Sequence, residues 1–187
     1  MPRWRSHRGS GGGNGGEAPT ATGALEQIAL NTGSIVMEVK QIPNQPLKFT
    51  EEKMEKYKDG RKEDALITYG WDKFLRGGRP EWLARLPMTK AVVRAMDTVQ
   101  SEFVNIQGFM VAGASKRGWT TWTTAAVDKR VIAIVPFVID MLNIQKSFKH
   151  HWEAYGFWAP AVDDYQDMKI FDRMETPEYA ELMKIEE

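Results

Sequence analysis

Hydrophobic and polar positions along the chain alternate between a helical period and the short apolar runs of strands. Helices are predicted over residues 21–31, 63–75, 88–103 and 116–127. Strands are predicted over residues 35–39, 109–112 and 131–139. The run Phe-Met-Val-Ala at 109–112 is continuously apolar, as expected for a strand that is buried on both faces. Strands that alternate with helices indicate βαβ units, so the predicted fold class is α/β, with a mostly parallel sheet flanked by helices.

The remaining segments lack a clear period. Residues 1–8 are predicted to be a disordered tail, and the highly charged residues 50–62 to be a solvated loop or a frayed helix. Residues 143–187 are aromatic and polar and are predicted to be helical in parts. The aromatic side chains at their start are interpreted first as core packing and second as a lid over a hydrophobic substrate. These side chains are Trp152, Tyr155, Phe157 and Trp158.

Composition and charge narrow the classes of partner and chemistry. The chain has 25 acidic and 25 basic side chains and no formal net charge, so binding to nucleic acid has no electrostatic support. No apolar run is long enough to span a membrane, and residues 1–8 lack the apolar stretch of a signal peptide. Cysteine is absent, which excludes disulfides, cysteine nucleophiles and thiolate metal sites. No cofactor motif is recognised.

The strongest chemical signal is the predicted strand, turn and helix around Ser115. A nucleophile elbow places a serine on a tight turn between a strand and a helix, and the turn requires small neighbours such as Gly113 and Ala114. The amide of Lys116, at the start of the helix, could then stabilise an oxyanion. The usual pattern is Gly-x-Ser-x-Gly, but here Arg117 stands at the second glycine position and Gly118 follows it. The alternative interpretation is a serine that caps the helix.

A longer set of segments resembles a known family. GASKRGWTTWTTAAVDKRVIAIVPFVIDMLN at 113–143 resembles the PhoPQ-activated pathogenicity-related proteins, which look like a branch of the α/β hydrolases. The resemblance extends upstream through MEVKQIPNQPLKF, EDALITYGWDKFL and LPMTKAVVRAMDTVQ to GGGNGGEAPT, and so covers about residues 11–187. It implies a partial α/β-hydrolase fold and a secreted or periplasmic protein, although the chain itself shows no signal peptide.

The resemblance changes the interpretation of two segments. By composition alone, the glycine run at 9–16 is a flexible linker. In a hydrolase it becomes the loop that donates the second oxyanion-hole amide, with Gly12, Gly13 and Asn14 as the candidate positions. Arg117 ceases to be an anomaly, because the pattern of the family resembles Gly-Ala-Ser-Lys-Arg-Gly.

The acid and the base of a serine triad are not evident after Ser115. The α/β-hydrolase order is Ser, then Asp or Glu, then His, so we expect residues 9–187 to be an incomplete domain whose acid and base lie beyond this chain. His150 and His151 are interpreted as a surface or lid pair and Asp140 as a capping or turn residue. No metal site is predicted, because adjacent histidines point in different directions and no carboxylate has ligand spacing.

The predicted function is a serine hydrolase that acts on ester or amide acyl bonds of an unknown small molecule or peptide, with Ser115 as the nucleophile. This chain alone should show negligible turnover, because a serine hydroxyl without a base is a weak nucleophile. The alternative is a non-catalytic, secreted signalling or virulence-associated protein on a hydrolase scaffold. Self-association through exposed sheet edges is also expected.

Overall fold

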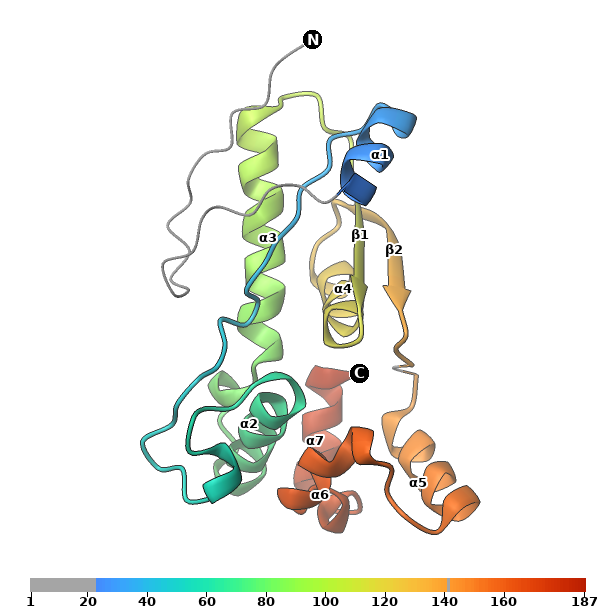
Figure 1. The fold of residues 1–187 in the computed structure, drawn as a ribbon. Coiled ribbons are helices and arrows are strands. Elements are labelled where there is room, and N and C mark those ends of the chain that lie inside the picture. The colour runs from blue at the N-terminus through green and yellow to red at the C-terminus, as the bar shows by residue number, and fades with distance from the viewer. Residues whose placement is uncertain (1–22, 141) are drawn as a thin grey trace.

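The computed structural model describes residues 23–140 and 142–187 (Figure 1). The helices are α1 (Gly23–Thr32), α2 (Glu63–Gly77), α3 (Arg85–Glu102), α4 (Lys116–Val127), α5 (Ile144–Tyr155), α6 (Asp163–Asp167) and α7 (Pro177–Glu186). The strands are β1 (Phe109–Ala114) and β2 (Val131–Phe137). Short 3₁₀ turns lie at Glu55–Tyr57, Pro80–Trp82, Pro160–Val162 and Phe171–Arg173. The predicted helices are confirmed, as is the partly helical character of 143–187. The predicted tail at 1–8 and glycine loop at 9–16 lie outside the described residues.

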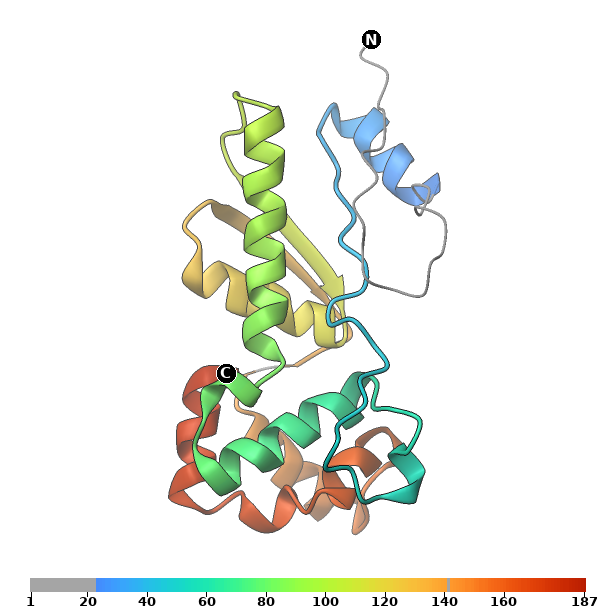
Figure 2. The same cartoon turned by 90° about the vertical axis from the view of Figure 1, so that its left-hand side faces the viewer.

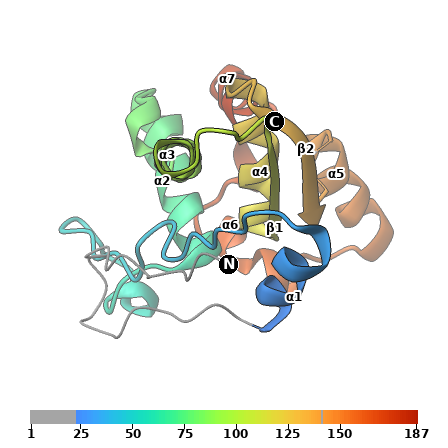
Figure 3. The same ribbon diagram turned by 90° about the horizontal axis from the view of Figure 1, so that it is seen from above.

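The sheet of the described residues has two parallel strands, joined by α4. Figure 1 shows both strands pointing toward the C-terminal helices α5, α6 and α7. Seen from above, α3, α4 and the sheet lie side by side, with α4 packed on both strands and α3 packed on α4 (Figure 3). A mixed helix and strand architecture with a parallel sheet is therefore confirmed, and it places the turn after β1 at the carboxyl edge of the sheet.

Two expectations about strands are wrong. Residues 35–39 form no strand, because their backbone pairs with no neighbour among the described residues, and Ile35 and Met37 stay partly exposed. A β-branched run becomes a strand only where another strand takes up its hydrogen bonds. β1 is not buried on both faces either: Met110, Ala112 and Ala114 face away from the α4 side and are exposed.

The core lies beyond the carboxyl ends of the strands, where α2 packs with α5, α6, α7 and the start of α4 (Figure 2). Trp71 of α2 is fully buried at its centre and makes edge-to-face contacts with Trp119, Tyr165 and Tyr179, whose ring centroids lie 5.4–6.3 Å away. Edge-to-face geometry is the favoured arrangement of aromatic rings and adds about 0.5–1.5 kcal/mol per pair beyond burial. These contacts join α2 to α4, α6 and α7.

A buried ion pair crosses the same region. Arg85 of α3 and Glu186 of α7 are both 1% exposed, and Arg85 Nε lies 3.3 Å from Glu186 Oε2. Trp71 Nε1 donates to Glu186 Oε1 at 2.9 Å, and Arg85 Nη1 donates to the carbonyl of Lys116 at 2.9 Å. Burial raises the pKa of Glu186 and lowers that of Arg85, since both charged forms lose water. The pair therefore connects α2, α3, α7 and the first residue of α4.

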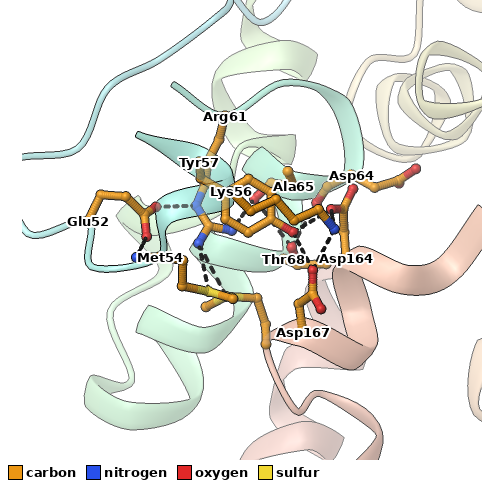
Figure 4. A network of polar contacts seen from close by, with 11 residues as sticks. Glu52, Met54, Lys56, Tyr57, Arg61, Asp64, Ala65, Thr68, Asp164 and Asp167 are labelled. Atoms are coloured by element: carbon orange, nitrogen blue, oxygen red, sulfur yellow. Dashed lines mark hydrogen bonds and ion pairs between the residues drawn. The ribbon is translucent and has the colours of Figure 1, made fainter. Parts of the chain in front are cut away.

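The segment 50–62 is a largely exposed loop, as predicted, but a second polar network ties it to α6 through two buried residues, Tyr57 and Arg61 (Figure 4). Arg61 is buried, donates to Glu52 and lies over the ring of Tyr57 at 3.8 Å. The Tyr57 hydroxyl donates to Asp164 Oδ1 at 2.6 Å and Asp167 Oδ2 at 2.8 Å, both on α6. Burial, with the two carboxylates, raises the pKa of Tyr57 and keeps the hydroxyl protonated as a donor. The charged segment is therefore an anchor for α6, because the Tyr57 hydroxyl finds its partners far along the chain.

One face of the sheet leaves apolar side chains in water. Met110 is 65% exposed, Phe137 is 54% exposed and Ile132, at the irregularity between the strands, is 74% exposed. Met110 and Phe137 share a face, since Met110 pairs with Ala133 and Ala114 pairs with Phe137. Each strand is also paired on one side only within the described residues. Exposed apolar strands of this kind favour association.

We predict that the isolated chain self-associates through this sheet and that the double substitution Met110→Lys and Ile132→Lys shifts it toward monomer. Lysine is strongly hydrated and opposes strand pairing at an edge. Sedimentation velocity over a concentration series measures the change. Val104→Lys, at an exposed apolar position outside both strands, is the control. A wild-type chain that stays monomeric at every concentration contradicts the prediction.

Candidate active site

Ser115 occupies a strained turn between β1 and α4. Its backbone has φ 52° and ψ −124°, a region that favours glycine because a side chain is crowded there. The turn is held by hydrogen bonds on both sides: the Ser115 amide donates to the carbonyl of Phe137, and the Trp119 amide donates to the carbonyl of Ser115, each at 2.9 Å. The Ser115 side chain makes no capping hydrogen bond with α4, so the alternative of a capping serine is wrong.

Gly113 and Gly118 allow the tight turn. A Cβ atom at Gly113 would lie 2.6 Å from the carbonyl carbon and oxygen of Arg117. A Cβ atom at Gly118 would lie 2.9 Å from the Gly113 carbonyl and 2.7 Å from the Ile139 side chain. Gly118 therefore permits the close approach of α4 to the sheet, while Arg117 points into an ion pair. This packing explains why the second glycine stands at position 118, one residue later than in the usual Gly-x-Ser-x-Gly pattern.

Ser115 lines a cavity of about 220 Å³ at the carboxyl end of the strands. Ile139, two residues after β2, and Ile144 and Phe148 of α5 line it with Val162 and Tyr165. The wall opposite Ser115 thus comes from 139–165, part of the segment interpreted as core or lid. Tyr165 and Phe148 also belong to an aromatic cluster with Trp158 and Phe171, so this wall is continuous with the packed interior.

Acidic residues of α2 face basic residues of α4 beside Ser115. Lys116 Nζ lies 2.6 Å from Asp64 Oδ2, and Asp64 also lines the cavity. Arg117 binds Glu63 with both guanidinium nitrogens, and the Gln45 side chain donates to the same carboxylate. The Arg117 hydrogen bond is the main reason why the pKa of Glu63 falls to about 2. Sequence reasoning did not find Glu63 and Asp64, since only the fold brings these charges within reach of α4.

Among the described residues, no histidine lines the cavity with Ser115. His151 Nε2 accepts from the Ala159 amide at 3.2 Å and its ring stacks parallel to Trp158, while His150 is exposed. Asp140 reaches the cavity, but its Oδ1 accepts the Leu142 amide at 3.1 Å, as in a turn.

Of the predicted oxyanion-hole groups, the structure describes Lys116 but not the glycine loop. Lys116 is the first residue of α4, so its amide has no acceptor within the helix and its role stays a prediction. Gly12, Gly13 and Asn14 lie outside the described residues. Within residues 23–140 and 142–187, no cluster of three metal-ligating side chains is present. In the same ranges, no helix is both long and apolar enough to cross a membrane.

Comparison with known proteins gives the relationship of this chain. Residues 9–187 match the model of the PhoPQ-activated pathogenicity-related protein family. The chain belongs to this family. It is 44% identical over 167 residues to the autocrine proliferation repressor protein A of Dictyostelium discoideum, which covers 86% of the chain and 33% of that relative. The chain of this PhoPQ-related protein thus spans about a third of the length of the curated relative. No solved structure gave a significant match.

We predict that Gly113→Ala and Gly118→Ala each destabilise this PhoPQ-related chain by about 1–3 kcal/mol, the usual cost of overpacking. The new methyl group at Gly113 would press on backbone atoms of Arg117, and the one at Gly118 would press on the Gly113 carbonyl and the Ile139 side chain. Backbone atoms cannot move aside as a side chain can. Chemical denaturation measures the free energy of unfolding. Gly77→Ala is the control, because a Cβ atom there has open space. Equal stabilities of all three variants would refute the close approach of α4.

We predict that Glu63 stabilises the fold near neutral pH and that this contribution disappears in acid. The folded pKa of about 2 lies below the ordinary value of 4.5, so the stabilisation is present above the ordinary value and is lost as pH falls toward 2. The carboxylate is partly exposed, so we expect about 1 kcal/mol after solvent screening. Unfolding of wild type and Glu63→Gln, measured from about pH 6 to about pH 2, should show a gap that closes in acid.

Glu153→Gln, at an exposed position of α5, controls for the loss of one carboxylate. A gap between wild type and Glu63→Gln that stays constant over the whole pH range contradicts the prediction.

Proposed function

We propose that this PhoPQ-related chain contains the nucleophile elbow of a serine hydrolase, part of an α/β-hydrolase fold, that acts on ester or amide acyl bonds. The backbone of Ser115 carries the proposal: a non-glycine residue at φ 52° and ψ −124°, on the turn from a parallel strand into a helix, beside a cavity. Strain of this kind is concentrated at functional sites. Five other non-glycine residues of the described chain also have positive φ, so the proposal rests on the combination of this backbone with the place of the turn between β1 and α4 and beside the cavity. The Ser115 hydroxyl makes no capping hydrogen bond with α4, which supports the same role.

In this proposal the hydroxyl oxygen of Ser115 attacks the carbonyl carbon of the acyl substrate. The carbonyl oxygen becomes an oxyanion, stabilised by the Lys116 amide at the positive end of α4 and by an amide of the Gly12, Gly13 and Asn14 segment. Arg85 positions the first turn of α4 through the Lys116 carbonyl. The triad acid and base would come from residues beyond the chain, and the serine proton would pass to that base.

A second candidate is a secreted, non-catalytic signalling protein on the same scaffold. The name of the Dictyostelium discoideum relative, an autocrine proliferation repressor, supports it. The absence of a histidine beside Ser115 within the described residues is compatible with it. Under this proposal the protein would act outside the cell or in the periplasm, and the cavity would serve no chemistry.

Labelling with a fluorophosphonate probe separates the two candidates. The probe reacts with an activated serine, so we expect labelling of the longest natural polypeptide that contains this chain and its loss in Ser115→Ala. Ser147→Ala, at an exposed serine that lines the same cavity, should label like wild type. A folded protein that does not label, or that labels equally in Ser115→Ala, refutes the hydrolase and favours the signalling protein.

A further inference from the structure

The cavity beside Ser115 has an apolar interior and a more polar mouth. Its most buried members are Trp119, Ile144 and Tyr165, which mark the floor. Ile139, Phe148 and Val162 are half-buried and form the sides. The exposed members, Asp140, Ser147 and Ala161, lie where the cavity meets solvent. Ser115 is itself half-buried, so a group bound to its oxygen has apolar walls on the inner side.

The charged groups at the cavity already have partners. Asp64 is paired with Lys116 and accepts the Tyr165 hydroxyl at 3.3 Å. Burial and the nearby Asp64 charge raise the pKa of Tyr165, so the hydroxyl stays a neutral donor. Asp140, a second acidic side chain, lies at the mouth. Since no lysine or arginine is among the described lining residues, and Lys116 beside the cavity is paired with Asp64, this cavity opposes a carboxylate or phosphate on the part of the substrate that enters it.

The size of the cavity restricts the substrate further. A volume of about 220 Å³ is smaller than the roughly 300–1,000 Å³ of pockets for drug-sized ligands. Phe148 contacts Tyr165 and Phe171 with centroids 5.7 and 5.0 Å away, and Val162 packs against the core, so neither side can withdraw without loss of packing. The cavity therefore holds a short hydrocarbon chain, whereas a long one has to extend past Val162 and Phe148 or out of the mouth.

We propose that this cavity is the acyl pocket of the site and that it selects a short, uncharged, apolar acyl group, with Val162 and Phe148 as the residues that limit chain length. This inference rests on the hydrolase proposed above, because it assigns the acyl group to the inner side of Ser115. Recognition comes from the apolar sides and floor, and rejection of acidic groups comes from Asp140 at the mouth and from the apolar interior, which offers no unpaired cation among the described lining residues.

The test is the rate at which a series of alkyl fluorophosphonates, ethyl, butyl and octyl, labels the longest natural polypeptide that contains this chain. We expect ethyl and butyl probes to react at least about tenfold faster than the octyl probe, as hydrophobic pockets discriminate by about 10–200-fold per methylene group. Val162→Phe should reduce labelling by the butyl probe about tenfold or more. Val162→Ala should raise labelling by the octyl probe.

Val127→Phe is the matched control, since Val127 is an exposed valine at the end of α4, outside the cavity. Thermal melting of each variant shows that it is folded. Ser115-dependent labelling that is independent of chain length, or unchanged by both Val162 variants, overturns the acyl pocket and leaves the hydrolase intact. A folded protein that reacts with no member of the series overturns the hydrolase and the acyl pocket together.

Discussion

The buried ion pair of Arg85 and Glu186 is the interaction on which the arrangement of the helices depends. Removing two charges from water is costly, and hydrogen bonds to the remaining donors and acceptors offset part of that cost. Here the Trp71 indole, the Lys116 carbonyl and the Thr120 hydroxyl, 3.0 Å from Arg85 Nη1, supply such partners, while Arg85 Nη2 is buried without one. Because these groups come from α2 and α4 as well as α3 and α7, the pair fixes the relative positions of all these helices.

The same pair determines where Ser115 stands. Lys116 follows Ser115 directly, and its carbonyl is held by a guanidinium that cannot move without leaving Glu186 unpaired. Arg85 also lies over the Trp119 ring at 4.1 Å, one turn along α4. The turn after β1 is thus held from the core side by Arg85 and from the sheet side by Phe137. Precision of this kind would suit the nucleophile role proposed for Ser115, because small displacements of a reacting group are costly.

Local patterns in the sequence were sufficient for the elements and for the position of the turn. The helices over 63–75, 88–103 and 116–127 and the strands that begin at 109 and 131 follow from periodicity, and the small residues before Ser115 predict the tight turn. What could not be predicted depends on partners distant in the sequence. Residues 35–39 lack a neighbouring strand among the described residues, and Arg61 is buried between the Tyr57 ring and Met168, the residue after α6. Asp64 could be assigned to the site only from the fold, which places Lys116 against α2.

The strained backbone of Ser115 has a consequence for how this position can change over time. A serine at this φ and ψ costs of order 1–3 kcal/mol relative to a relaxed residue, and glycine would avoid most of that cost. Mutation supplies glycine from serine through a single-base change in some codons, so drift toward stability alone would remove the side chain. If serine is retained here over evolution despite this cost, selection acts on a function of the hydroxyl and not on stability.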